Sequence, residues 1–217
     1  MEMTHPATAD QLGRLLRLGT ATIHEAQGQR GAVDSAIAPL DPSMRVAGPA
    51  LTLDIRPGDN LMIHYALTKA RAGDVLVVDA KQFVNAGPWG DVLTFAAQKI
   101  GIAGLVIDGA VRDATNIVEM GFPVFCRGLC IRGTNKVQPG RLNVPVVIGG
   151  APINPGDIII GDRDGLVVVA AEELQSIIDA SEAREEKEAG MRKKLEQGAT
   201  MVELLGLQAT LDSYGLH

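Results

Sequence analysis

The sequence predicts an α/β fold in which helices cover a sheet that contains parallel strands. Nearly continuous apolar runs at residues 74–78 and 104–107 are bounded by turn residues, as expected of strands buried on both faces. These runs alternate with segments of helical periodicity, which is the pattern of an α/β layer. After Pro123 the pattern changes to short β runs separated by Gly and Pro, and there we expect a second, mostly antiparallel sheet.

The first part of the chain begins this α/β layer. Residues 9–27 are expected to be helical, because leucines recur at core spacing along them. Residues 48–55 alternate as a strand that ends at an Arg-Pro-Gly turn, and a helix is expected over residues 59–71. The apolar run at 74–78 then supplies the next strand.

The middle of the chain repeats the alternation. Residues 92–100 form an apolar-periodic run preceded by Asp91, so a helix is expected to begin there. The strand at 104–107 follows, and residues 114–121 form the next expected helix.

The last part combines short strands with a long helix. Apolar β runs occur at residues 144–148, 158–160 and 166–169, with glycine-rich turns between them. From Ala171 to about Leu195 the chain is rich in charged residues, as is typical of a solvated helix stabilised by pairs four residues apart.

The composition indicates a single domain. A chain of 217 residues with 46% hydrophobic content can bury one sizeable core. We therefore expect one domain over residues 1–217, with a helical C-terminal extension from about residue 171. Cys126 and Cys130 are too few for a disulfide framework and lack the second ligand pair of a structural zinc site.

Several functional classes are disfavoured. The formal net charge of −6 argues against a nucleic-acid surface, which normally carries a basic patch. The chain has neither a glycine-rich dinucleotide loop after a strand nor a Walker motif. Residues 1–10 lack the features of a secretion signal, and no apolar run approaches a membrane span. We expect a cytoplasmic enzyme that binds neither nucleic acid nor membrane.

The strongest functional signal is the pair of segments Gly90-Asp91-Val92-Leu93 and Arg112-Asp113. Each lies where a strand or loop gives way to a helix, so the side chains are expected at neighbouring strand ends. The first amides of the helix after Asp91 can bind an anion, and Arg112 can grip a carboxylate with two hydrogen bonds. Asp113 suits Mg²⁺, which prefers oxygen ligands. Together these groups predict a site for a divalent metal and a 2-oxo acid.

Simpler interpretations exist for each of these residues. Asp is a favoured N-cap, so helix capping alone could explain both Asp91 and Asp113. Arg112 could be an ordinary surface ion-pair partner. His24 and His64 are candidate acid–base groups, although a lone histidine in a helix is more often structural.

The spacing of Asp91 from Arg112-Asp113 resembles the signature of the class II pyruvate aldolases. These enzymes cleave 4-hydroxy-4-methyl-2-oxoglutarate and 4-carboxy-4-hydroxy-2-oxoadipate, and they belong to the family similar to regulator of ribonuclease E activity A, the RraA-like family. The resemblance covers roughly residues 10–205. It extends through residues 56–60, 121–125 and 143–146, and through the Gly-Asp turns at 155–157 and 161–165.

The resemblance implies a three-layer β/β/α swivelling-domain fold with helical N- and C-terminal segments. It implies retro-aldol cleavage of a 4-hydroxy-2-oxo di- or tricarboxylic acid to pyruvate and a second oxo acid. Oxaloacetate decarboxylation is expected as a secondary activity, because both reactions pass through the pyruvate enolate. The implied cofactor is a divalent metal, Mg²⁺ or Mn²⁺, and the implied assembly is a homotrimer or hexamer.

The resemblance also implies roles for single residues. Gly90, Asp91, Val92, Leu93 and Arg112 would bind the substrate, with Arg112 and Asp91 catalytic. Asp113 would hold the metal, and Glu188 of a neighbouring subunit would reach the metal through water. The alternative for Glu188 is a solvent-facing position on the charged helix.

Two observations limit what the resemblance to the aldolases implies. Many family members have an acidic residue where this chain has Asn116, which leaves a second direct metal carboxylate in doubt. Other members act as protein-binding regulators of ribonuclease E without aldolase activity, and this remains the alternative function. The segment that continues through Glu188 to Gly215 resembles the aldolase branch.

Overall fold

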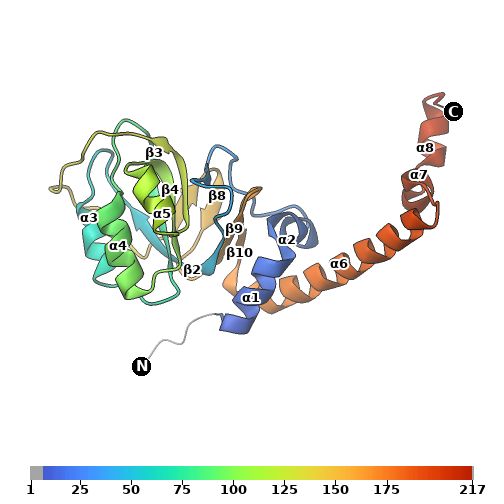
Figure 1. Cartoon of the computed structure of the whole chain (residues 1–217), viewed down its shortest axis with the longest axis horizontal. Helices are drawn as coiled ribbons and strands as arrows, with labels where there is room; N and C mark the ends of the chain where they lie inside the picture. Colours follow the sequence, from blue (N-terminus) through green and yellow to red (C-terminus); the bar gives the residue numbers. More distant parts are fainter. Residues whose placement is uncertain (1–6, 217) are drawn as a thin grey trace.

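The computed structural model describes residues 7–216 as a sheet covered by helices, with a long helix projecting from one side (Figure 1). Residues 1–6 and 217, the ends of the predicted domain, lie outside the described residues. The helices are α1 (Ala9–Leu18), α2 (Thr20–Ala26), α3 (Leu61–Leu67), α4 (Asp91–Ile100), α5 (Ala114–Glu119), α6 (Leu174–Glu196), α7 (Met201–Leu205) and α8 (Gln208–Ser213). The strands are β1 (Ala38–Pro39), β2 (Val46–Asp54), β3 (Val75–Phe83), β4 (Gly104–Val111), β5 (Val124–Leu129), β6 (Arg141–Leu142), β7 (Val146–Ile148), β8 (Ala151–Ile153), β9 (Ile158–Asp162) and β10 (Gly165–Val169).

Strand β2 joins the parallel and antiparallel parts of the main sheet, whose order is β1-β5-β4-β3-β2-β9-β10. Residues Ala50 to Asp54 of β2 pair in parallel with β3, whereas Val46 to Pro49 pair antiparallel with β9. The expected second, mostly antiparallel sheet is therefore only partly right: β9 and β10 do pair antiparallel, but they extend the main sheet through β2. Within residues 7–216, only the β7–β8 hairpin forms a sheet of its own.

Helices α3, α4 and α5 cover one face of the parallel strands (Figure 1). Alternate residues of β3 serve the two faces, as the pleat of a strand requires. Leu76 and Val78 join the cluster beneath these helices, while Val75 and Val77 join the cluster on the opposite face. All four side chains are fully buried, which explains why the sequence of this strand shows no polar alternation.

The opposite face is covered by β structure. Ile148 and Ile153 of the β7–β8 hairpin pack with Ile159 and Val168 in the same cluster as Val77. The far side of β9 and β10 then packs against α1, α2 and the first turns of α6. The α/β class and the layered swivelling-domain arrangement are thus confirmed.

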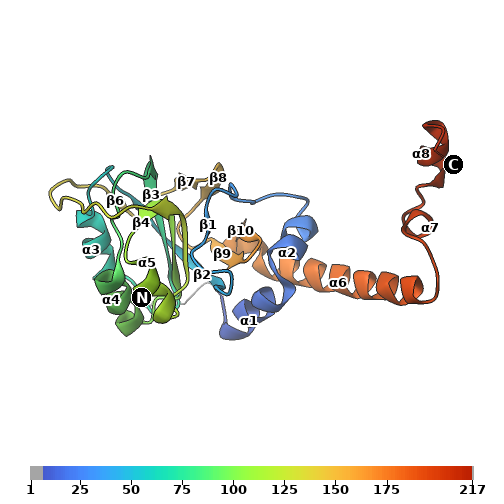
Figure 2. The same ribbon diagram turned by 45° about the horizontal axis from the view of Figure 1, so that its top comes forward.

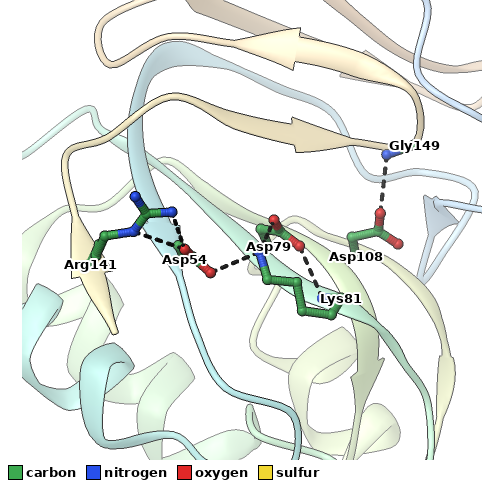
Figure 3. Close-up of polar contacts among 6 residues, drawn as sticks. All are labelled: Asp54, Asp79, Lys81, Asp108, Arg141 and Gly149. Atoms are coloured by element: carbon green, nitrogen blue, oxygen red, sulfur yellow. Dashed lines mark hydrogen bonds and ion pairs between the residues drawn. The ribbon is translucent and has the colours of Figure 1, made fainter. Parts of the chain in front are cut away.

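A buried carboxylate ties the β7–β8 turn to the parallel sheet. Asp108 of β4 is 2% exposed and accepts a hydrogen bond of 3.1 Å from the Gly149 N–H (Figure 3). The Arg127 guanidinium pairs with the other oxygen of Asp108. Each oxygen of the carboxylate therefore has a partner, which offsets the free-energy cost of burying the charge.

The carboxyl ends of β2 and β3 are joined by a second charged cluster (Figure 3). Asp54 accepts from Arg141 Nη2 at 2.6 Å and lies 2.8 Å from Lys81 Nζ, which also contacts Asp79 at 2.5 Å. Burial opposes ionisation of Asp54, but Lys81 and Arg141 outweigh it and hold the pKa of Asp54 below its usual value. Every charge in this cluster has a partner, so we assign it a structural role.

The main differences from the expected elements lie at their ends. Gly19, at φ 79° and ψ 159°, splits the expected helix over 9–27 into α1 and α2. Strand β3 runs beyond its apolar part to Phe83, and Lys81 and Gln82 within it adopt left-handed φ values of 59° and 58°. This irregularity shifts the register between β3 and β4 and directs the chain into the loop before α4.

The long helix α6 begins in the core and ends in solvent. Its buried residues, Leu174, Ile177, Ile178 and Ser181, all lie in its first turns. Beyond them α6 extends away from the sheet, with α7 and α8 at its far end (Figure 2). Within residues 7–216, no helix is long and apolar enough to cross a membrane.

The core predicts a clear stability test. Ile107 of β4 is fully buried beneath α3–α5, so we expect Ile107→Ala to lower the free energy of unfolding by about 2–5 kcal/mol through lost contacts and a cavity. Val147 of β7 is 58% exposed, and Val147→Ala is expected to change that free energy by less than about 0.5 kcal/mol. Denaturant unfolding measures both; equal effects would contradict this description of the core.

Candidate active site

A cavity of about 340 Å³ lies where the loop after β3, the start of α4 and the end of β4 meet. It contains all five residues predicted to bind substrate: Gly90, Asp91, Val92, Leu93 and Arg112. The remaining lining residues come from the start of α3, the loop before α4 and the loop after β5: Asn60, His64, Gly87, Pro88, Gly133, Thr134 and Lys136.

Gly90 allows the two predicted segments to touch. A Cβ at Gly90 would collide with Oδ2 of Asp113 and would stand 3.1 Å from Nε of Arg112. Gly87 is similarly confined, because a Cβ there would lie 2.6 Å from the carbonyl oxygen of Cys130. Any larger residue at these positions would separate the loop before α4 from the end of β4.

Asp113 directs its carboxylate toward the neighbouring helix rather than its own. It occupies the N-cap position of α5 but adopts a left-handed backbone, with φ 57° and ψ 37°, and makes no capping hydrogen bond. Its Oδ2 accepts from the Asp91 N–H at 3.3 Å and lies 3.5 Å from Arg112 Nε. Helix capping therefore does not explain Asp113.

Asp91 is the first residue of α4, with Gly90 as the N-cap. Its Oδ1 accepts from the Val92 N–H at 2.7 Å, so it does serve one amide of its own helix. Its Oδ2 accepts from Asn116 Nδ2 at 2.9 Å. The Asn116 amide is the main cause that lowers the pKa of Asp91 below its usual value, with further help from the Val92 N–H and the charge of Arg112. Asp91 is therefore a carboxylate at neutral pH.

Arg112 combines a fixed backbone with an accessible side chain. Its N–H donates to the carbonyl of Trp89 at 2.9 Å, and its side chain is 45% exposed. Trp89 is fully buried and donates from Nε1 to Thr94 Oγ1 at 2.8 Å, while that hydroxyl donates to the Gly90 carbonyl at 3.0 Å. Trp89 is therefore a core residue that holds the loop.

His64 lies in the cavity, whereas His24 lines a different hollow near β10. Desolvation by the surrounding chain and the positive charge of Lys136 lower the pKa of His64 below its usual value. The neutral imidazole is therefore its main form at neutral pH.

Sequence reasoning missed Asn60, Thr134 and Lys136 as cavity residues. Asn60 lies in a segment that resembles the aldolases, so a signal was present, and its Nδ2 donates to the Pro88 carbonyl at 2.9 Å. Lys136 carried no local signal, because it reaches the cavity only when the loop after β5 folds back onto residues 58–60.

Glu188 lies on the exposed part of α6, away from this cavity in its own chain. It pairs with Arg184 at 3.1 Å and with Arg192 at 3.8 Å. In the part of the chain that is described, no group of three or more His, Cys, Asp or Glu side chains could hold a metal ion. One chain thus does not unite Glu188 with Asp113, and its role in a neighbouring subunit stays a prediction.

The donor set nevertheless suits one kind of metal. Asp113 and Asp91 offer carboxylate oxygens at a partly exposed position beside the cavity. Mg²⁺ is often held by one or two carboxylates, with waters and substrate oxygens completing its shell. The residues present therefore fit a hydrated hard cation and do not resemble a closed structural zinc site.

Comparisons with known sequences identify the family of the chain. A family model described as RraA-like: Aldolase/RraA matches residues 20–168. A Halalkalibacterium halodurans protein, provisionally named 4-hydroxy-4-methyl-2-oxoglutarate aldolase, is 36% identical over 82% of this chain and 85% of its own length. A Burkholderia multivorans protein with the same provisional name is 36% identical over 67% of this chain and 88% of its own.

Solved structures share the fold. An uncharacterized Pseudomonas syringae protein superposes with a TM-score of 0.80 at 28% identity, covering 92% of this chain and 98% of that one. A Streptomyces coelicolor protein, described as an unusual member of the RNase ES inhibitor RraA family, gives a TM-score of 0.76 at 32% identity, covering 86% and 98%. The RNA-processing inhibitor RraA from Thermus thermophilis gives 0.64 at 27% identity, covering 70% and 92%.

The environment of His64 generates a titration prediction. We expect its pKa to lie below about 6.5, and Lys136→Met to raise the pKa without restoring the usual value, because desolvation is the larger cause. The unfolded chain then binds this proton more readily, so His64 costs no stability above about pH 6.5 but destabilises the fold as pH falls below that value. Histidine NMR titration measures the shift; an unchanged pKa in the variant would contradict the proximity of Lys136.

Proposed function

The chain belongs to the RraA-like (Aldolase/RraA) family, and we propose that it is a divalent-metal-dependent pyruvate aldolase. It would cleave a 4-hydroxy-2-oxo di- or tricarboxylic acid to pyruvate and a second oxo acid. One observation carries the proposal: the Asp113 carboxylate turns away from its own helix toward Asp91 and Arg112 beside the cavity. The aldolase names of two relatives support a lyase of this kind.

Substrate binding is assigned to Arg112 and the first turn of α4. The accessible guanidinium of Arg112 can donate two hydrogen bonds to the pyruvyl end of the substrate. The Val92 N–H already serves Asp91, so the Leu93 N–H is the amide of this turn that remains for a substrate carboxylate among the described residues. Both groups lie in the same cavity, which would fix the orientation of the 2-oxo acid.

Asp113, with Asp91 nearby, would hold the metal. A divalent cation bound there supplies positive charge that stabilises an enolate at the 2-oxo group, which removes the need for a Schiff-base lysine. The charge of Arg112 stabilises the same enolate.

Asp91 would act as the base. Its lowered pKa keeps it ionised, so it can accept the proton of the C4 hydroxyl through a bridging water. The C4–O bond then becomes a carbonyl, the C3–C4 bond breaks, and its electrons form the enolate of pyruvate. Protonation at C3 completes pyruvate. Loss of CO₂ from oxaloacetate gives the same enolate, so decarboxylation would be a secondary activity.

Asn116 fits this assignment. The Asn116 amide donates to Asp91 and holds its carboxylate in place. A carboxylate at this position could not donate that bond while ionised. The proposal therefore gives Asn116 a positioning role and no metal contact.

The RraA-type regulator remains a second candidate. Two of the solved structures are described as inhibitors of RNA processing or of an RNase. Large apolar side chains are also exposed near the cavity, among them Val92 at 78%, Phe95 at 54% and Val137 at 73%. Such a patch can bind another protein.

Pyruvate release decides between the two candidates. With Mg²⁺ or Mn²⁺ we expect pyruvate from both 4-carboxy-4-hydroxy-2-oxoadipate and oxaloacetate, measured by a coupled lactate dehydrogenase assay, and we expect EDTA to abolish it. No release with either metal would contradict the aldolase proposal. Pull-down with ribonuclease E would then test the regulator.

The role of Asp113 has a sharper test. Asp113→Asn removes the charge but keeps a residue that tolerates a left-handed backbone, so the fold should persist. We expect the metal-dependent rate of pyruvate release to fall by about 100-fold or more. The control Asp164→Asn, in the exposed β9–β10 turn, should keep full activity.

Thermal unfolding of the Asp113 variant provides the internal check. A melting temperature close to that of the parent chain is expected, because the Asp113 side chain makes no capping bond to α5 and the amide oxygen of an asparagine can still accept from the Asp91 N–H. A folded and fully active Asp113→Asn variant would overturn the assignment of this residue.

A further inference from the structure

We propose that Lys136 is a second anion-binding residue of the cavity. It binds the substrate carboxylate at the end of the molecule opposite the 2-oxo acid group. The inference rests on the proposed function and narrows its substrate class to dicarboxylates that bridge Arg112 and Lys136. Both side chains line the same cavity, but they arrive on different loops.

The loop that carries Lys136 is fixed on both sides of this residue. The Asn135 N–H donates to the Gly58 carbonyl at 2.9 Å, and the Asn135 carbonyl accepts from the Asn60 N–H at 3.0 Å. On the other side, Oδ2 of Asp59 accepts from the N–H groups of Val137 and Gln138 at 2.8 and 3.1 Å.

Asp59 is the buried centre of this anchorage. It is only 2% exposed, and its Oδ1 accepts from the Leu61 N–H at 2.9 Å. Burial opposes ionisation, but the N–H groups of Val137, Leu61 and Gln138, with a smaller effect from the charge of Lys136, outweigh it and hold the pKa of Asp59 below its usual value. This buried carboxylate holds the backbone after Lys136, while the backbone of Gly58 and Asn60 holds Asn135 before it, so the loop is ordered before any ligand arrives.

The charge of Lys136 remains available to a ligand. Among residues 7–216, no carboxylate lies within 4.0 Å of its ammonium group, whereas Lys81 contacts both Asp54 and Asp79. The neighbouring His64 is mainly neutral at neutral pH, so Arg112 and Lys136 supply the positive charge of the cavity lining. Of the charged residues that line the cavity, only Asp91 is acidic, and it faces Asn116.

The spacing suits a short dicarboxylate. A Cβ built on Gly133 would lie 3.7 Å from Arg112 Nη1, so that loop residue lies beside Arg112. Three residues farther along, the backbone at Lys136 lies at most roughly 10 Å from Gly133. Because both long side chains line the cavity, we infer that a chain of five or six carbons is long enough to bridge the two cations.

A matched pair of ligands tests this subsite without turnover. 2-Oxoadipate and 2-oxohexanoate have the same chain length, lack the 4-hydroxyl needed for cleavage, and differ in the remote carboxylate. By calorimetry in Mg²⁺, we expect the parent protein to bind 2-oxoadipate about tenfold more tightly, which corresponds to about 1.4 kcal/mol.

Variants of Lys136 then show whether the preference for 2-oxoadipate depends on this residue. Lys136→Met should abolish it while leaving the dissociation constant for 2-oxohexanoate within twofold, and Lys136→Arg should retain most of it. Lys99→Met removes an exposed lysine that contacts only the Phe95 ring among the described residues, and it should change nothing.

Three outcomes would overturn the inference. The parent protein could bind both ligands equally tightly, Lys136→Met could keep the preference for 2-oxoadipate, or Lys136→Met could lose affinity for both ligands by the same factor. The test stands apart from the aldolase assay. A preference that depends on Lys136 in a protein that releases no pyruvate would refute the proposed function and leave the subsite intact.

Discussion

The close contact between Asp113 and the Gly90–Asp91 corner is the constraint on which the site depends. It joins two segments that follow neighbouring parallel strands, and it exists only because Gly90 has no side chain. The contact in turn requires the irregular register of β3 and β4, where Phe83 pairs with Gly109, and the bond from the Arg112 N–H to Trp89. The fold thus fixes the backbone and leaves the charged side chains free to meet a ligand.

The electrostatics of the cavity follow from this contact. The left-handed backbone of Asp113 costs free energy, and no capping bond to α5 offsets that cost. Its carboxylate instead meets an amide and a guanidinium, while Asn116 orients Asp91. Such strain is typical of functional sites, where the surrounding fold stabilises an arrangement that local preferences disfavour. A substrate that carries carboxylates complements a cavity in which Arg112 and Lys136 outnumber Asp91.

Local patterns in the sequence predicted the α/β class, the helices that begin at Asp91 and Ala114, and the approach of Asp91 to Arg112. They failed where the structure depends on contacts between distant segments. No local pattern shows that β2 changes partner between β3 and β9, or that Asp59 captures the loop of Lys136. The left-handed Lys81 and Gln82 are not turn-type residues, so the bend there had no signal. The role predicted for Glu188 involves a second subunit and stays a prediction.

A crystal structure with Mn²⁺ and oxalate tests the central claim most directly, because oxalate has the shape and charge of the pyruvate enolate. The account predicts an anomalous peak for the metal beside the Asp113 carboxylate, with oxalate held between the metal and Arg112 at the start of α4. Metal and oxalate bound elsewhere, with the Asp113–Asp91 contact unchanged, would contradict it.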